Sequence, residues 1–187
     1  ICDFALWPDA EQDRAGVLAL AEACPEFLVA SSFSKNFGLY QDRTGALTLV
    51  ADDAVRADIA FSNVEIAIRV NYSNPPAHGG LIVSTILADA GLRQQWREEL
   101  DAMRVHIAAT RASFVAALKA HGVPGDFSFI TRQKGMFSFS GLSDSQVKFL
   151  RERKSIYMVA GGRINVAGIT PRNIAYLCAS IKEAAEP

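Results

Sequence analysis

Lys35 stands in a segment rich in hydroxyl side chains, directly after a short apolar run. The run covers residues 27–30 and the polar segment covers 31–38. Burying an ammonium group costs free energy unless the group is paired or loses its proton. A deprotonated lysine is a nucleophile that forms a Schiff base with an aldehyde. Considered alone, Lys35 fits the simpler interpretation of a surface lysine in a loop, so its neighbours decide between the two.

Three side chains near Lys35 are suited to binding an anion. Ser32 and Ser34 supply hydroxyl groups, and Arg43 supplies a guanidinium whose planar set of N–H donors matches the oxygens of a phosphate. A lysine nucleophile beside a phosphate site is the combination that binds pyridoxal 5'-phosphate, an aldehyde with a phosphate group. The residues therefore suggest pyridoxal phosphate as cofactor.

Four stretches of the sequence together indicate a family. They read SSFSKNFGLYQDRTG at 31–45, RVNYSNPPAHG at 69–79, GMFSFSGL at 135–142 and GRINVAG at 162–168. They resemble signatures of the class I aspartate and aromatic-amino-acid aminotransferases, which have fold type I and depend on pyridoxal phosphate. The order of the stretches and the spacing between the lysine and the arginines also resemble the family. The resemblance extends over nearly the whole chain and corresponds to the second half of a usual member.

The resemblance implies a role in cofactor binding for five residues. Lys35 would form the Schiff base and then move a proton between the substrate Cα and the cofactor. Ser32, Ser34 and Arg43 would bind the cofactor phosphate. Asp3 would keep the cofactor's ring nitrogen protonated, although the family's next residues, including a tyrosine, differ here.

The resemblance also implies substrate contacts. Arg163 would bind the substrate α-carboxylate through a bidentate pair, and Phe137 would form an apolar wall beside the substrate. Arg69 would reach the neighbouring subunit's site and bind a side-chain carboxylate there, with Ser73 near that site's phosphate. A homodimer with shared active sites follows, acting on amino acid and 2-oxo acid substrates. Without the resemblance, Arg163 and Phe137 fit ordinary strand and core positions, and Arg69 fits a cation at a helix C-terminus.

Composition excludes several classes of function. The 187 residues carry 19 Lys plus Arg and 20 Asp plus Glu, so the formal net charge is -1 and predicts no nucleic-acid or membrane partner. Cys2, Cys24 and Cys178 are odd in number and lack CxxC spacing, which argues against disulfides and a metal site. We expect a soluble, cytoplasmic protein.

Alternating apolar runs and helical periodicities predict an α/β fold. The resemblance implies that residues 1–100 are the C-terminal part of a large cofactor-binding domain, with a mixed, mostly parallel sheet and helices. Residues 101–187 are expected to form a smaller α+β domain, joined through a long helix whose apolar stripe runs from Trp96 to Leu118. The other expected helices are at 9–24, 55–69, from 78, from 143 with a capping box, and from 170; the expected strands are at 27–30, 46–50, 127–130, 136–139, 156–159 and 163–166.

Two functions remain open from the sequence. The first is pyridoxal-phosphate-dependent transfer of an amino group between aspartate, or an aromatic amino acid, and 2-oxoglutarate. The second is a truncated, non-catalytic aminotransferase remnant that acts only by protein association. The family's first half would supply further cofactor contacts that this sequence does not contain, and the sequence does not choose between aspartate and aromatic substrates.

Overall fold

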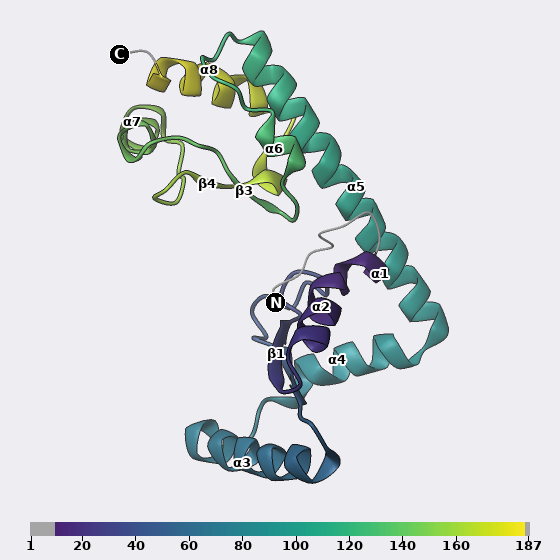
Figure 1. The fold of residues 1–187 in the computed structure, drawn as a ribbon. Helices are drawn as coiled ribbons and strands as arrows, with labels where there is room; N and C mark the ends of the chain where they lie inside the picture. Colours follow the sequence, from purple (N-terminus) through teal and green to yellow (C-terminus); the bar gives the residue numbers. More distant parts are fainter. Residues whose placement is uncertain (1–9, 186–187) are drawn as a thin grey trace. The chain divides into compact units, whose positions relative to one another are not determined.

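The computed structural model describes residues 10–185, so Asp3 and Cys2 lie outside the described residues. The chain divides into two compact units, and the division falls between Asp101 and Ala102, inside helix α5 (Ala90–Ala120) (Figure 1). We call them the N-terminal and the C-terminal unit. No helix in the described part of the chain is long and apolar enough to cross a membrane.

Among its described residues, the N-terminal unit contains one small sheet and four helices besides α5. Strand β1 (Phe27–Ser32) pairs with strand β2 (Gly45–Val50) in antiparallel orientation, with Phe27 opposite Val50 and Ser32 opposite Gly45. The helices are α1 (Ala10–Asp13), α2 (Ala15–Ala23), α3 (Ala54–Tyr72) and α4 (Ala77–Ala88). The expectation of a mostly parallel sheet is wrong for the described strands. Residues 33–44 join β1 to β2 without a helix, and parallel neighbours require a crossover connection.

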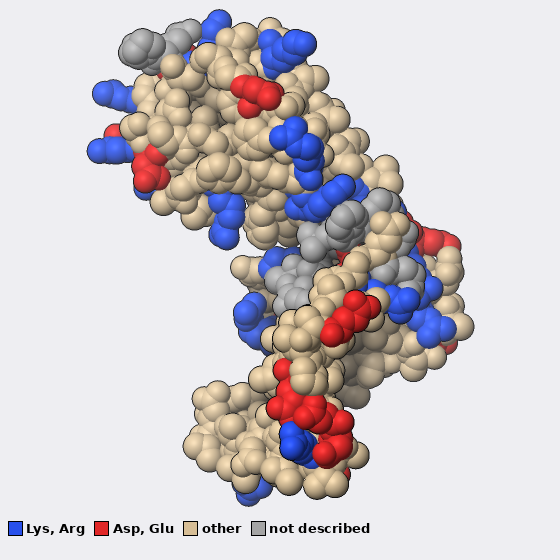
Figure 2. Space-filling view, viewed as in Figure 1, with Lys and Arg blue, Asp and Glu red and all other residues tan. Residues whose placement is uncertain are grey.

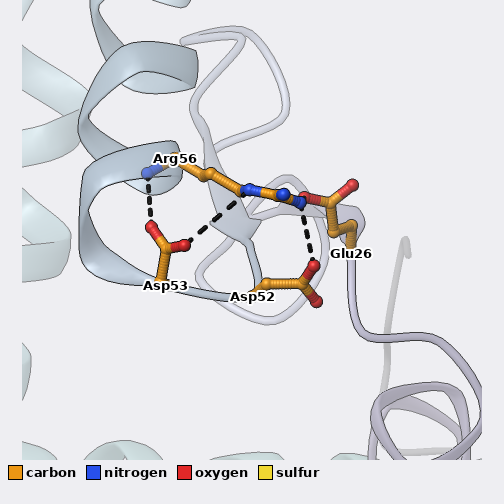
Figure 3. A network of polar contacts seen from close by, with 4 residues as sticks. All are labelled: Glu26, Asp52, Asp53 and Arg56. Carbon is orange, nitrogen blue, oxygen red and sulfur yellow. Dashed lines mark hydrogen bonds and ion pairs between the residues drawn. The ribbon is translucent and has the colours of Figure 1, made fainter.

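The start of α3 is fixed by a group of charged side chains around Arg56 (Figure 3). The Asp53 carboxylate caps the helix by accepting the Arg56 backbone N–H at 2.8 Å. The Arg56 guanidinium forms ion pairs with Asp52 at 3.0 Å and with Glu26 at 3.5 Å. Glu26 directly precedes β1, so these pairs connect the start of the helix to the start of the strand. All four side chains are exposed, and we therefore expect them to orient α3 more than to stabilise it.

Helix α3 extends beyond its expected end at residue 69 and carries an apolar stripe that is exposed. Val55, Ile59 and Ile66 were expected to mark one face, and they are 68%, 59% and 62% exposed. By contrast, the buried apolar side chains of this unit are Leu39, Val83 and Leu100. The described residues thus form the helix but do not cover its apolar face.

The C-terminal unit has a continuous core. Its elements after α5 are α6 (Phe129–Arg132), β3 (Phe137–Phe139), α7 (Asp144–Lys154), β4 (Arg163–Asn165), the short helix η1 (Val166–Gly168) and α8 (Ile174–Ala185). Strands β3 and β4 are antiparallel, with Ser138 opposite Ile164. The core consists of Phe114, Leu118, Val123, Ile130, Leu142, Val147, Leu150, Ile164, Ile169, Cys178 and Ile181. The stripe predicted on the long helix supplies two of these residues, Phe114 and Leu118.

Two of the expected strands in this unit are wrong. The segment 127–130 turns into α6, because the Asp126 carboxylate accepts both the N–H and the hydroxyl of Ser128 and starts a turn. The segment 156–159 has only an isolated bridge between Val159 and Arg163. The capping box is confirmed: the Ser143 hydroxyl accepts the Gln146 N–H, and the Gln146 side chain accepts the Ser143 N–H.

The expected helix from residue 170 begins later than predicted. Helix α8 starts at Ile174, after a turn in which Ile174 already donates its N–H to the Thr170 carbonyl at 3.0 Å. The Asn173 side chain accepts the Thr170 N–H at 2.7 Å. Thus Asn173, rather than Thr170, supplies the side-chain hydrogen bond at this end.

Candidate functional site

The candidate cofactor site is the loop that connects β1 to β2. Its base is closed by the Phe33 N–H, which donates to the Thr44 carbonyl at 3.0 Å. Helix α4 packs closely against Thr44 at Gly79, where a Cβ atom would overlap the Thr44 hydroxyl. A glycine is therefore required at this close approach, and it lets α4 support the loop.

Hydroxyl groups line the start of the loop. Ser32 is the last residue of β1, and its hydroxyl donates to the Ser34 hydroxyl at 3.0 Å. The Ser34 N–H donates in turn to the Ser32 hydroxyl at 3.3 Å. Ser34 is buried and Ser32 is half-buried. The structure thus brings together the two serines that the sequence assigned to phosphate binding.

Two cations lie near one aromatic ring in the same loop. The Lys35 ammonium lies 4.4 Å from the centroid of the Tyr40 ring, and the Arg43 guanidinium carbon lies 5.9 Å from it. Arg43 also donates from Nη1 to the Tyr40 carbonyl at 3.2 Å, with its own backbone at a positive φ of 54°. In the part of the chain that the structure describes, neither Lys35 nor Arg43 forms an ion pair with a carboxylate.

Sequence reasoning missed the contacts that hold the middle of the loop. Trp96 on α5 donates its indole N–H to the Asn36 carbonyl at 2.7 Å. Its ring stacks on Phe37 with centroids 4.7 Å apart and an interplanar angle of 15°. The sequence assigned Trp96 only to the packing stripe of the long helix. Its position at the first turn of that stripe was the signal that could have indicated a contact with the loop. Trp96 positions the residue next to Lys35.

Arg69 and Ser73 lie together at the end of α3. The Ser73 N–H donates to the Arg69 carbonyl at 3.2 Å, and Ser73 has a positive φ of 70°. Both residues line a pocket of about 620 Å³, and Arg43 lines another of about 650 Å³. Pro75 lines both pockets. No described hydrogen bond or ion pair joins Arg69 to Lys35, and the role of Arg69 in a neighbouring subunit stays a prediction.

Arg163 and Phe137 meet on one face of the sheet in the C-terminal unit. Phe137 and Arg163 are exposed, whereas Ser138 and Ile164 alternate with them on the buried face. The Arg163 guanidinium carbon lies 5.1 Å from the Phe137 ring centroid. Both residues line a pocket of about 340 Å³ that also includes Asn165, an arrangement in which the guanidinium remains open to a carboxylate.

Gly162 sets the backbone just before Arg163. It has a positive φ of 73°, and a Cβ atom there would lie 2.7 Å from the Ser140 hydroxyl. That hydroxyl donates to the Gly162 carbonyl at 2.6 Å. The turn into β4 is therefore fixed by a glycine and a buried serine that the sequence reasoning did not assign to the site.

Charged side chains of both signs are present on the face drawn in Figure 2. On the face drawn in Figure 2, acidic side chains gather near α3 with a basic one beside them, and basic side chains are spread over the C-terminal unit. This mixture agrees with the formal net charge of -1. The candidate site rests on the Lys35 loop and on the Arg163 pocket.

Comparison with known proteins decides the family. The sequence profile of the family described as aminotransferase class I and II matches residues 4–181. The chain belongs to this family. The family predicted from the four sequence stretches is thus confirmed.

The aminotransferase chain is similar both to aspartate aminotransferases and to an aromatic-amino-acid aminotransferase. It is 56% identical over 171 residues to the aspartate aminotransferase of Salmonella typhi, which covers 91% of this chain and 43% of that enzyme. It is 43% identical over 173 residues to the aromatic-amino-acid aminotransferase of Pseudomonas aeruginosa, covering 92% and 43%. The chain thus spans less than half the length of these relatives.

Solved aminotransferase structures show the same fold. The crystal structure of the aromatic-amino-acid aminotransferase from Burkholderia pseudomallei, covalently bound to pyridoxal phosphate, matches with a TM-score of 0.88 and 46% identity. The match covers 94% of this aminotransferase chain and 44% of that one. At this level the expected fold type is confirmed, while the described strands are antiparallel pairs.

Proposed function

We propose that this chain is part of an aminotransferase that uses pyridoxal 5'-phosphate. The observation that carries the proposal is that one loop holds two cations, Lys35 and Arg43, together with the hydrogen-bonded hydroxyls of Ser32 and Ser34. A phosphate is negatively charged and accepts from hydroxyl and guanidinium donors. The donor set therefore fits the cofactor.

Each residue of the loop has a defined task in this proposal. Ser32, Ser34 and Arg43 would bind the phosphate, in the same loop as Lys35. When bound, the cofactor supplies an electron sink for cleavage of the substrate Cα–H bond. The Lys35 amine holds the cofactor and then carries the proton from and to Cα, which requires that its ammonium leave the face of the Tyr40 ring.

Substrate binding is assigned to the arginines. Arg163, supported by the Phe137 ring, binds the α-carboxylate through a bidentate pair. Arg69 and Ser73 serve the site of the neighbouring subunit in a homodimer, and Asp3 contacts the cofactor ring. The amino donor is aspartate or an aromatic amino acid, and 2-oxoglutarate is the acceptor.

The same proposal extends to the domains. We assign residues 1–100 to the cofactor-binding large domain and 101–187 to the small domain, in a cytoplasmic enzyme. The names of the relatives support both kinds of amino donor, because aspartate and aromatic-amino-acid aminotransferases match over nearly the same share of this chain.

The absorption spectrum of the chain mixed with pyridoxal phosphate tests the function. We expect a band that depends on Lys35, disappears in Lys35→Ala, and changes when aspartate is added. Lys119→Ala is the matched control, because Lys119 is an exposed lysine in the last turn of α5. A band of equal strength in Lys35→Ala contradicts the assignment of Lys35.

A second candidate function, association without catalysis, is favoured by α3. Its exposed stripe includes Ile59, Ile66 and Val70, which is 82% exposed, and contiguous apolar surface of this kind marks interaction sites. Sedimentation of the chain with and without Ile66→Glu separates the two candidates. A Lys35-dependent band in either protein supports the enzyme, whereas assembly lost in Ile66→Glu, with no band in the unaltered chain, supports association alone.

A further inference from the structure

Arg111 is a buried cation that the proposed chemistry does not use. It lies on α5 within the C-terminal unit and is 3% exposed. Desolvation by burial lowers the pKa of its guanidinium. Among the residues that the structure describes, no carboxylate forms an ion pair with it. A buried charge is tolerated only when hydrogen bonds satisfy it, so the acceptors around Arg111 explain its presence.

The acceptors of Arg111 belong to one continuous stretch, from α6 to β3. Four are backbone carbonyls and one is a hydroxyl. Nη1 donates to the Ile130 carbonyl at 3.1 Å and the Ser138 hydroxyl at 2.8 Å; Nη2 donates to the carbonyls of Gly135 at 2.7 Å, Phe137 at 2.7 Å and Lys134 at 3.4 Å. Arg111 therefore fixes the path of the chain that leads into β3.

Arg111 and Gln133 occupy the edge of β3 that β4 leaves open. Alternate carbonyls of a strand point to the same edge, and here the Phe137 carbonyl accepts from Arg111 while the Phe139 carbonyl accepts from Gln133 at 3.2 Å. Gln133 also accepts the Phe139 N–H at 2.9 Å. The Ser138 hydroxyl connects the two side chains, because it accepts from Arg111 and donates to Gln133. The Arg111 and Gln133 side chains thus form the hydrogen bonds that a third strand would form at this edge.

The backbone that Arg111 holds carries the Phe137 ring. In the register of the sheet, Phe139 is opposite Arg163 and Phe137 is its diagonal neighbour on the same exposed face. The Arg163 guanidinium lies over the Phe137 ring. A shift of the Phe137 backbone would therefore move the ring that supports Arg163.

We propose that Arg111 is a positioning residue for the carboxylate-binding arginine: by holding the Gly135 and Phe137 carbonyls it places the Phe137 ring under Arg163. This inference rests on the proposed function, in which Arg163 binds the substrate α-carboxylate. The planar guanidinium is required because its two Nη atoms reach acceptors on both α6 and β3. A lysine has one nitrogen and does not span the same set.

The resonance of the Arg163 side-chain Nε–H in the 187-residue chain tests the proposal. In the unaltered protein we expect the Phe137 ring to shift the resonance of this proton by its ring current. Arg163→Lys identifies the signal, because it removes the proton. Phe137→Leu gives the position of the signal without the ring. We expect Arg111→Lys to lose this shift while the circular dichroism still shows a folded protein. Arg97→Lys, an exposed arginine on the same helix, is expected to keep it.

Each outcome decides the proposal. A folded Arg111→Lys protein that retains the ring-current shift overturns it, and so does an unaltered chain without such a shift. If Arg111→Lys does not fold, Ser138→Ala removes one acceptor and the connection to Gln133 while Arg111 remains. A reduced shift in Ser138→Ala then supports the proposal, and an unchanged shift overturns it. The measurement needs no cofactor, so a missing Lys35-dependent band would overturn the proposed function without affecting this result.

Discussion

The ammonium of Lys35 lies over the face of Tyr40, with Nζ 4.4 Å from the ring centroid. The Arg43 guanidinium carbon lies 5.9 Å from the same ring centroid. Because the aromatic face is electron-rich, it attracts both cations, and each such contact at an exposed site contributes about 0.5–1 kcal/mol. Tyr40 is 61% exposed, so its ring contacts these cations at the surface and is not a core residue.

Replacing Tyr40 separates the role of the ring from the role of its hydroxyl. We expect Tyr40→Leu to lower the free energy of unfolding of the N-terminal unit by about 1–2 kcal/mol, because both cation contacts are lost. Tyr40→Phe keeps the ring and should change it little. Urea unfolding followed by tryptophan fluorescence measures both, with Tyr157→Leu as control because Tyr157 is 80% exposed. Equal losses in the Leu and Phe variants would contradict the ring contact.

The indole N–H of Trp96 offers a second test of the loop. Trp96→Phe removes the hydrogen bond to the Asn36 carbonyl but keeps a ring against Phe37. We expect the free energy of unfolding to fall by about 1 kcal/mol, the usual value of one hydrogen bond. Urea unfolding followed by circular dichroism measures this loss. The Lys35-dependent absorption band with pyridoxal phosphate should also weaken, because Asn36 adjoins Lys35.

Trp96→Leu is the matched comparison for that variant. It removes both the hydrogen bond and the stacked ring, so its loss of stability should exceed that of Trp96→Phe by about 0.5–1.5 kcal/mol. If Trp96→Phe unfolds at the same urea concentration as the unaltered chain, the hydrogen bond does not hold the loop.

Local patterns in the sequence predicted most helices because their signals are local. The capping box at Ser143 and the stripe on the long helix depend on residues within a few turns, and both are present. The segment 127–130 was predicted wrongly because the Asp126 side chain, rather than the apolar pattern, decides its turn. The pairing direction of β1 and β2 depends on the length and shape of the connection between them, which periodicity does not report.

In the candidate site, too, the sequence predicted the residues that are close together along the chain and missed those that are far apart. Ser32, Ser34 and Lys35 are close in sequence, and the structure keeps them in one loop. Arg111 was missed because a charged residue on an apolar stripe was passed over, although it stands four residues after Ile107 and three before Phe114. The Ile130 and Ser138 acceptors are 19 and 27 residues away along the chain, a separation that no local pattern reveals.

Ser143 tests the stability of the C-terminal unit independently of the site. Ser143→Ala removes the side-chain acceptor at the start of α7 and with it half of the capping box. We expect a loss of about 1 kcal/mol in the free energy of unfolding, the usual effect of losing an N-cap. Ser113→Ala is the control, since Ser113 is exposed on α5. If the two variants unfold alike, the capping box does not contribute to stability.

Cys178 is expected to make the C-terminal unit less stable as the pH rises through the alkaline range. Burial in the core raises the pKa of its thiol to about 11, whereas an exposed cysteine ionises near pH 8.5. The folded state therefore keeps a proton that the unfolded state releases in this range. The stabilising contribution is fully present below about pH 8.5 and is lost as the pH rises through 11. The total change is roughly 3–3.5 kcal/mol.

Urea unfolding of the C-terminal unit at several values between pH 8 and 11 measures this dependence. We expect Cys178→Ala to lower the stability at neutral pH, because it leaves a cavity, and to flatten the decline at alkaline pH. Tyrosines and lysines also titrate in this range, but they do so in both proteins, so the difference between the two curves isolates Cys178. Cys24→Ala, at a half-buried position outside this core, should keep the full slope. An unchanged slope in Cys178→Ala would show that the thiol is not protected from ionisation by burial.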